Sequence, residues 1–501
     1  MTLPHGFAVV LDRHTRVLDG GRALLGGQPT RLLRLTPRAR PLLTGRTVRV
    51  HDRAGALLAD RLLATGLAHP LVTALPPHRR DVTYVIPVRD RAAPLDRLLA
   101  SIRATTPDAP VLVVDDASHD PAPVAAAAAR HHARVVPLTA NLGPAGARNA
   151  GLRQVTTPYV VFADSDIVLA PDTVDVLLRH FADPAVVMAA PRITGLPGPG
   201  ADRWLGRYEN ARSSLDLGRD PATVRTGSPV SWLPAACLLA RTDALTEVGG
   251  FDAGMRVGED VDLCWRLTAA GGRIRYEPAV HAAHEHRTDP TDWFLRKAAY
   301  GTGAHPLARR HPDNIAPAVL APWSAALLGT VLAQRRWSLP VAGGLAAVAT
   351  LRNARKLRGI ERPLPHAARL TALGTLATLT QGAALLTRHW WPLTAVGCLA
   401  SRRVRRAAAV AAVADVALEV LGSPPSGLDP VRYAAARRLD DLAYGSGVWL
   451  SALKGRSTAA LRPRIVLRTR RTRRTHPPRP PLPRPPAAHR AAEPPPRTPA
   501  A

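Results

Sequence analysis

Between residues 81 and 163, four short apolar runs alternate with segments of helical periodicity, and this alternation limits the folds open to the chain. The runs cover residues 82–88, 111–114, 134–138 and 159–163, and helices are expected at 95–102, 123–131 and 146–154. Continuous apolar strands joined by helices of this length form a parallel sheet with helices on both faces. The sequence therefore predicts an α/β domain whose ligand site lies at the carboxyl ends of the strands.

Carboxylates follow three of the four predicted strands. Asp90 comes after the first strand, Asp115 and Asp116 after the second, and Asp164-Ser165-Asp166 after the fourth. Because parallel strands end at one edge of a sheet, we expect these side chains in one site. Two carboxylates one residue apart provide oxygen ligands for Mg²⁺ or Mn²⁺, which also bind substrate phosphates. Asp115 or Asp116 can accept hydrogen bonds from a ribose or a base edge.

The third strand is followed by a glycine-rich segment, residues 141–149, that opens a helix. Gly143 and Gly146 let the backbone approach a ligand, and free N–H groups at a helix N-terminus attract phosphate. Arg148, in the first turns of this helix, can make a charge-assisted contact with a diphosphate. Asn149 either contacts the ligand or packs against the sheet.

A second group of candidates lies further along the chain. The apolar stretch 228–239 has small residues at its centre and is expected to form a strand that a substrate can approach. Glu259 and Asp260 open a helix, where acids either complement the helix dipole or provide a general base at the mouth of the site. One of the three histidines that follow can complete the cation site: His281, His284 or His286.

Six motifs in this order resemble those of the family 2 glycosyltransferases of GT-A fold. They stand at residues 85–90, 114–118, 141–149, 164–166, 249–252 and 258–263. The resemblance covers about residues 81–290. It implies a Rossmann-like catalytic domain, a nucleotide-sugar donor, a divalent cation, Mn²⁺ or Mg²⁺, and transfer with inversion at the anomeric carbon.

The same resemblance implies roles for individual residues. The residues expected to contact the nucleotide sugar are Asp90, Asp115, Asp116, Arg148 and Asp164, with Arg148 near the diphosphate. The expected metal ligands are Asp166, Asp164 and His284. Asp260, with Glu259 beside it, would deprotonate the acceptor hydroxyl.

Further segments resemble the glycosyltransferases of mycofactocin systems. They are residues 24–36, 300–304, 309–312 and 438–449. This resemblance implies UDP-glucose as the donor and, as the acceptor, the precursor of a peptide-derived redox cofactor that is extended to a short oligosaccharide. The alternative is a cell-envelope enzyme of the same fold that acts on a lipid-linked or polysaccharide acceptor.

Three further regions flank the catalytic domain, which we place at residues 79–300. Residues 1–78 are expected to form a winged-helix-like module with a helix at 38–43, similar to peptide-recognition domains. Residues 301–460 are expected to be helical. Either they form a soluble helical domain, or residues such as 315–334 and 370–387 associate with a membrane. A loop is expected at 444–449. Residues 461–501, rich in Arg and Pro, are expected to be disordered.

Charge and cysteine content constrain the partners and the compartment. The formal net charge is +29, but only 4% of residues are aromatic, so the basic segments lack the aromatics that stack on bases, and we expect no nucleic-acid partner. Three cysteines cannot form a disulfide framework, which fits a reducing compartment. We therefore expect the protein in the cytoplasm or on the cytoplasmic side of the cell membrane.

Overall fold

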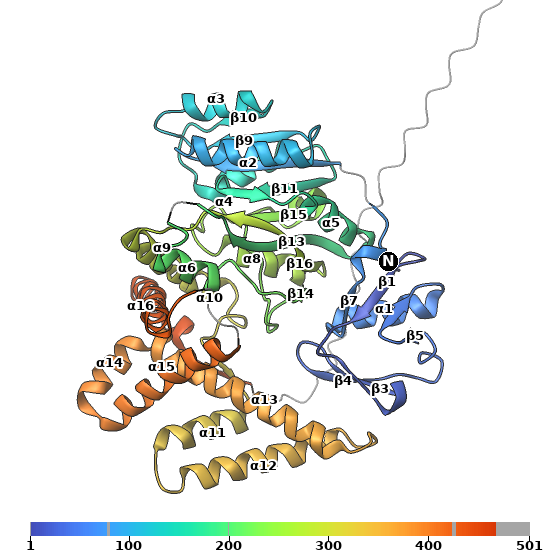
Figure 1. The fold of residues 1–501 in the computed structure, drawn as a ribbon, viewed down its shortest axis with the longest axis vertical. Coiled ribbons are helices and arrows are strands. Elements are labelled where there is room, and N and C mark those ends of the chain that lie inside the picture. The colour runs from blue at the N-terminus through green and yellow to red at the C-terminus, as the bar shows by residue number, and fades with distance from the viewer. Residues whose placement is uncertain (1, 78–80, 199, 423–426, 467–501) are drawn as a thin grey trace, which may run out of the picture.

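The computed structural model describes residues 2–77, 81–198, 200–422 and 427–466. Figure 1 shows three parts: a small N-terminal module in blue, a central sheet flanked by helices, and a C-terminal group of helices in yellow to red. The predicted disordered tail lies outside the described residues from position 467 onward.

The central sheet has nine strands in the described residues, in the order β10-β9-β8-β11-β15-β13-β16-β12, with β14 paired to β16. They are β8 (Val82–Val88), β9 (Val111–Asp115), β10 (Arg134–Pro137), β11 (Tyr159–Ala163), β12 (Ile167–Leu169), β13 (Val186–Gly195), β14 (Ala222–Val224), β15 (Cys237–Arg241) and β16 (Arg273–His284). The four predicted strands run parallel, which confirms that part of the prediction. β15 runs antiparallel to both of its neighbours, so the sheet as a whole is mixed.

Helices cover both faces of this sheet. They are α2 (Ala92–Thr105), α3 (Ala122–Arg130), α4 (Gly143–Leu152), α5 (Thr173–Arg179), α6 (Trp204–Arg212), α7 (Thr242–Glu247), α8 (Glu259–Ala269), α9 (Pro290–Thr302) and α10 (Ala304–Arg310). Alternate residues of β8 enter two different core clusters: Tyr84 and Ile86 pack with the α2 leucines, and Val85 packs with α4. Gly151 lets α4 approach the sheet, since a Cβ there would lie 2.3 Å from a Val85 methyl.

The N-terminal module contains one α-helix in its described residues and two small sheets, ordered β5-β6-β1-β7 and β2-β3-β4. Its elements are β1 (Ala8–Leu11), β2 (Arg16–Leu18), β3 (Ala23–Gly26), β4 (Arg31–Arg34), β5 (Leu43–Thr44), β6 (Thr47–Arg49), α1 (Arg53–Thr65) and β7 (Ala68–Pro70). The helix expected at 38–43 is wrong: this segment is a turn that leads into β5. Pro41 lacks the N–H that a helix would need there. The module therefore shares strands and one helix with the winged-helix prediction, but not this second helix.

The module is joined to the catalytic domain through a buried polar chain. His69 on β7 lies 2.8 Å from Asp12, and its other ring nitrogen lies 3.1 Å from Arg275 on β16. Arg275 also donates to Thr223 on β14 at 2.6 Å. Burial lowers the pKa of Arg275 to about 10, which leaves the guanidinium charged at neutral pH. The module therefore packs against the catalytic domain through buried hydrogen bonds.

The C-terminal helices are only partly as predicted. The elements are β17 (Val319–Leu320), α11 (Pro322–Ala333), α12 (Ser338–Lys356), α13 (Pro363–Ala384), a π-helical turn (Leu385–His389), α14 (Trp391–Ala400), α15 (Arg402–Gly422), α16 (Pro430–Lys454) and β18 (Arg464–Ile465). The uncharged stretch 315–334 contains a helix of 12 residues, which is too short to cross a bilayer. The predicted tail is ordered at its start, since β18 pairs with β17.

The loop predicted at 444–449 is wrong, because these residues lie inside α16. The polar character of this segment suggested a loop, but Gly445 and Gly447 are places of close approach between helical segments. A Cβ on Gly447 would lie 1.8 Å from the Ala298 carbonyl oxygen of α9, and one on Gly301 would lie 2.1 Å from the Tyr444 carbonyl oxygen. Tertiary packing therefore outweighs the poor helix propensity of glycine.

This contact gives the first prediction. Gly447→Ala should lower the free energy of unfolding by about 1–3 kcal/mol, because the added methyl group must displace backbone. The matched control is Gly343→Ala in α12, where a Cβ meets nothing within 4 Å. That variant should be neutral or more stable by up to about 1 kcal/mol. Thermal unfolding followed by circular dichroism measures both, and equal melting temperatures for the two variants would contradict the packing argument.

Candidate active site

A cavity of about 1500 Å³ opens at the carboxyl ends of the central strands. It is lined from the catalytic domain and from the C-terminal helices. Seven of the nine predicted site residues line it: Asp116, Arg148, Asp164, Asp166, Glu259, Asp260 and His284. The structure thus brings together residues that are up to 168 positions apart, from Asp116 to His284 (284 − 116 = 168).

Asp90 and Asp115 do not line this cavity in the described residues. The Asp90 carboxylate accepts hydrogen bonds from the His119 backbone N–H and ring, both at 2.7 Å. Asp115 accepts from the Ser118 backbone N–H at 3.0 Å. Both carboxylates therefore stabilise the turn after β9, while Asp116 faces the cavity and accepts from the backbone N–H of Leu142 at 2.7 Å.

Arg148 joins the two halves of the site. Its guanidinium donates to Asp164 at 2.6 Å and to Glu259 at 3.1 Å, and it lies 5.4 Å from the centre of the Phe251 ring. The side chain is almost fully buried, so these ion pairs are formed away from bulk water. The sequence predicted that Arg148 contacts a diphosphate. In the structure its guanidinium instead contacts two carboxylates, and these ion pairs hold Asp164 and Glu259 in place. Asn149 donates to the Phe251 carbonyl oxygen at 2.7 Å, which favours packing over ligand contact.

The candidate cation site contains Asp166 and His284. His284 Nε2 lies 3.5 Å from Asp166 Oδ1, and its buried Nδ1 has no hydrogen-bond partner in the described residues. Of the three histidines only His284 lines the cavity in the described residues, so the geometry favours His284 over His281 and His286. Carboxylate oxygens with one imidazole suit a divalent cation whose remaining ligands come from phosphate and water.

The protein alone offers too few ligands at one point to hold a cation in the described residues. Within the described ranges, no three His, Cys, Asp or Glu side chains are grouped closely enough to hold a metal ion. Asp164 is engaged by Arg148, and Arg91 is ion-paired with Asp166. The residues present therefore fit a cation that arrives with a phosphate-bearing ligand better than one held permanently by the protein.

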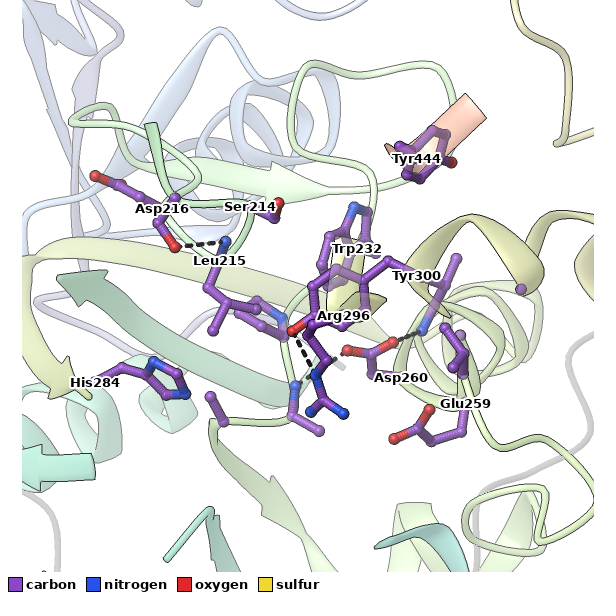
Figure 2. Close-up of a pocket in the computed structure, with 18 of the residues that line it drawn as sticks. Ser214, Leu215, Asp216, Trp232, Glu259, Asp260, His284, Arg296, Tyr300 and Tyr444 are labelled. Atoms are coloured by element: carbon purple, nitrogen blue, oxygen red, sulfur yellow. Dashed lines mark hydrogen bonds between the residues drawn. The ribbon is translucent and has the colours of Figure 1, made fainter. Parts of the chain in front are cut away.

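Asp260 is the most perturbed acid in the cavity. Burial, together with the neighbouring charge of Glu259, raises the pKa of Asp260 from 3.8 to about 7. Its carboxylate accepts from the backbone N–H groups of Val261 at 2.8 Å and Ala235 at 3.2 Å. A carboxylate with a pKa near neutral pH is suited to accept a proton from a substrate hydroxyl. Figure 2 shows it beside Glu259 and facing the same cavity as Trp232 and Tyr300.

The segment 228–239, which contacts Asp260 through Ala235, is not the strand that the sequence predicted. Only the end of the stretch 228–239 is a strand, since β15 begins at Cys237. Ser231 to Ala236 form a loop that lines the cavity, with Ala235 bonded to Asp260. Pro229 and Pro234 interrupt strand pairing because they lack the N–H donor.

Comparison with known proteins agrees with this geometry. The chain matches the model of "Glycosyl transferase family 2" over residues 83–233 and that of "Glycosyl transferase family group 2" over residues 159–395. A pre-mycofactocin glycosyltransferase of Mycobacterium tuberculosis is 43% identical over 478 residues, which cover 92% of this chain and 98% of the relative. The chain belongs to glycosyltransferase family 2.

Other proteins are similar to part of the chain. An N-acetylglucosaminyl-diphospho-decaprenol L-rhamnosyltransferase of the same organism is 30% identical over 243 residues, 42% of this chain and 79% of the relative. A solved mannosyltransferase from Pyrobaculum calidifontis, in complex with GDP-Man and Mn²⁺, aligns with a TM-score of 0.37 at 20% identity over 62% of this chain and 89% of that one.

The site of this family 2 glycosyltransferase also contains cations that sequence reasoning missed. Arg91, Arg287 and Arg296 all line the cavity. Arg91 directly follows the motif at residues 85–90, so its place in the sequence could have identified it as a site residue. Arg296 donates to Tyr300 at 3.3 Å, four residues further along α9. For Arg287 and Arg296 the position became clear only from the folded chain, because one precedes α9 and the other lies on it, both beyond the last motif at residues 258–263.

The raised pKa of Asp260 gives the second prediction. The folded state disfavours the charged carboxylate, so this group should destabilise the enzyme increasingly as pH rises from about 4 through 7. Asp260→Asn should therefore melt at a higher temperature than wild type at pH 8, by a difference that shrinks toward pH 4. Differential scanning fluorimetry across this range measures it. The exposed Asp108→Asn is the control and should show no such pH-dependent gain.

Proposed function

We propose that the enzyme transfers a hexose from a nucleotide sugar to a hydroxyl of a peptide-derived cofactor precursor, with inversion at the anomeric carbon. The observation that supports this most directly is the shared cavity. It places Asp260, with a pKa near neutrality, in the same space as Asp116 and the Asp164–Asp166 pair. A base and a diphosphate-binding edge in one cavity are what a single displacement requires.

The donor half would be formed by the strand ends. Asp116 would accept hydrogen bonds from the nucleoside, and the α4 N-terminus would lie toward the diphosphate. Asp166 and His284, with Asp164 nearby, would hold Mn²⁺ or Mg²⁺. A bound cation would neutralise charge that develops on the leaving diphosphate. Arg287 and Arg296 line the same cavity and would add positive charge there.

The acceptor half would centre on Asp260. In a single displacement, Asp260 takes the proton of the acceptor hydroxyl while that oxygen forms its bond to the anomeric carbon and the bond to the diphosphate breaks. The neighbouring charge of Glu259, which is ion-paired to Arg148, helps to raise the pKa of Asp260 and so makes its carboxylate a stronger proton acceptor. The displacement needs no covalent enzyme intermediate.

The acceptor and donor identities rest on the named relative and on the motif resemblance. The 43% identical protein is a pre-mycofactocin glycosyltransferase, and the alignment covers almost all of both chains. We therefore propose mycofactocin biosynthesis as the pathway, UDP-glucose as the donor, and extension to a short oligosaccharide. A lipid-linked acceptor is the second candidate, because a 30% identical relative is a rhamnosyltransferase named for a decaprenol-linked substrate.

The third prediction tests this function. Full-length enzyme with UDP-glucose, Mn²⁺ or Mg²⁺ and the peptide-derived precursor should yield a product heavier by one or more hexoses in mass spectrometry. Asp260→Asn should lose transfer by about a hundredfold or more while still binding the donor. Asp166→Asn should weaken cation-dependent donor binding itself, measured by calorimetry. Transfer to a polyprenyl-linked sugar, with none to the precursor, would favour the lipid acceptor instead.

We also propose that the C-terminal helices lie on the cytoplasmic face of the cell membrane. In α14 no residue is buried among the described ones, and Leu393, Val396 and Leu399 are 57%, 67% and 86% exposed. By length and composition alone, the described residues contain one helix able to cross a bilayer, Pro363–His389. Exposed apolar side chains on several helices fit an interfacial position.

Basic residues flank these apolar helices. Pairs of arginines stand between α11 and α12 and at the start of α15: Arg335, Arg336, Arg402 and Arg403. Trp337, beside the first pair, is 52% exposed, and tryptophan prefers the headgroup region. Arginines at the ends of apolar helices would contact anionic headgroups, which favours a membrane that contains anionic lipids.

The fourth prediction follows from this surface. The enzyme should sediment with vesicles that contain phosphatidylglycerol and less with neutral vesicles, and high salt should weaken binding. The triple variant Leu393→Ser, Val396→Ser, Leu399→Ser should lose most of the binding. The control is Leu57→Ser in the N-terminal module, also largely exposed, which should bind as wild type. Equal binding of both variants would remove α14 from the contact, and failure of the wild type to bind either kind of vesicle would favour a soluble helical domain.

A further inference from the structure

The cavity continues past Asp260 to the C-terminal helices. One face of α16 lines it, at positions seven, four and four residues apart: Tyr433, Asp440, Tyr444 and Val448. This spacing places the four side chains on one side of a helix. Figure 2 shows Tyr444 entering the pocket from α16, on the side where Trp232 and Tyr300 stand. The acceptor end of the cavity is therefore built partly by a region outside the catalytic domain.

The π-helical turn before α14 lies against this face. A Cβ on Gly445 would be 2.0 Å from the Arg388 carbonyl oxygen, and the Trp449 ring N–H donates to the His389 carbonyl at 2.8 Å. These contacts set the positions of Arg388 and His389, which both line the cavity. The Arg388 guanidinium lies 4.0 Å from the centre of the Tyr444 ring. π-Helical turns of this kind are frequent at functional sites.

The cations that contact the acids of α16 are already paired. Arg388 lies 3.4 Å from Asp441, and Lys297 lies 2.9 Å from Glu209 and 3.8 Å from Asp440. Asp441 is shared with Arg437 and Arg438, so the acids and bases alternate in one buried network. A phosphate or carboxylate here would have to break one of these pairs. The charge pattern therefore favours a neutral ligand at this end.

Two buried polar atoms that line this end have no partner in the part of the chain that is described. They are His389 Nδ1 and Asp440 Oδ1. Burial, and the nearby charge of Arg388, lower the pKa of His389 to about 4, so its imidazole is neutral at pH 7. Buried polar groups of this kind normally have a hydrogen-bond partner. A hydroxyl group is a suitable partner for either atom, because it can donate to a carboxylate and either donate to or accept from an imidazole.

We propose that the α16 face and the π-helical turn form an acceptor subsite for a neutral ring that bears a hydroxyl group. The ring is indicated by the aromatic side chains that line the cavity beside it, Trp232, Tyr300 and Tyr444, since sugar rings and phenols both pack on such surfaces. This subsite rests on the proposed transferase function and names the part of the acceptor that it recognises. Because this subsite lies outside the catalytic domain, that domain alone would not determine which acceptor the enzyme binds.

The fifth prediction uses the full-length enzyme with small probes in saturation-transfer NMR and calorimetry. Methyl β-glucoside or 4-ethylphenol should bind the wild type, and Tyr444→Leu and His389→Phe should each weaken that binding about tenfold or more. Leu439→Ala, on the outer face of α16, is the control and should bind as wild type. Binding of the glucoside indicates an acceptor that already carries a sugar, and binding of the phenol indicates an aromatic aglycone.

Two outcomes would overturn the subsite: unchanged binding of both ring probes in the two variants, or tighter binding of isopentenyl phosphate that the same variants abolish. Donor hydrolysis without acceptor, measured as UDP release in the same samples, separates this from the transferase function. If wild type hydrolyses UDP-glucose and the variants do so equally, the donor half is intact and any loss belongs to the subsite. If wild type shows neither hydrolysis nor donor binding, the transferase proposal fails whatever the ring probes do.

Discussion

The ion pairs of Arg148 connect the two halves of this enzyme. Asp164 stands at the end of β11, where the parallel half of the sheet ends, and Glu259 stands in the first turn of α8 beside Asp260. A single buried guanidinium thus determines the distance between the diphosphate edge and the candidate base. Removal of one partner would leave buried charge uncompensated, which costs far more than the loss of a surface ion pair. The electrostatics of the whole site depend on this residue.

The acceptor end of the cavity depends on a different constraint: the backbones of neighbouring helices lie very close together. Gly301 and Gly447 let α9 and α16 meet at distances that any side chain would prevent, and Gly445 does the same for the π-helical turn. Those contacts place Tyr300 and Tyr444 around one cavity. The N-terminal module adds rigidity on the other side through its buried Arg275 chain. Donor chemistry is thus set by charges, whereas acceptor shape is set by packing.

This difference explains what the sequence could and could not predict. The strands β8, β9 and β11 were predicted because they are nearly continuous apolar runs, and Asp164 and Asp166 were found because they directly follow a strand. The α16 face was missed, since the polar character of residues 444–449 suggests a loop when the helices that Gly445 and Gly447 contact are unknown. Asp90 and Asp115 were expected in the site because each follows a strand, but the sequence does not reveal that both carboxylates bond to the turn after β9.

The position of Asp260 shows how function and stability oppose each other here. An acid that is buried beside Glu259, without a cation of its own, raises the free energy of the folded state at neutral pH. The enzyme tolerates it because backbone N–H groups of Val261 and Ala235 partly satisfy the carboxylate. A cation placed directly against Asp260 would relieve the cost, but it would also lower the pKa and weaken the base. Arg148 pairs with Glu259 instead, which keeps the neighbouring charge in place and leaves Asp260 free to accept a proton.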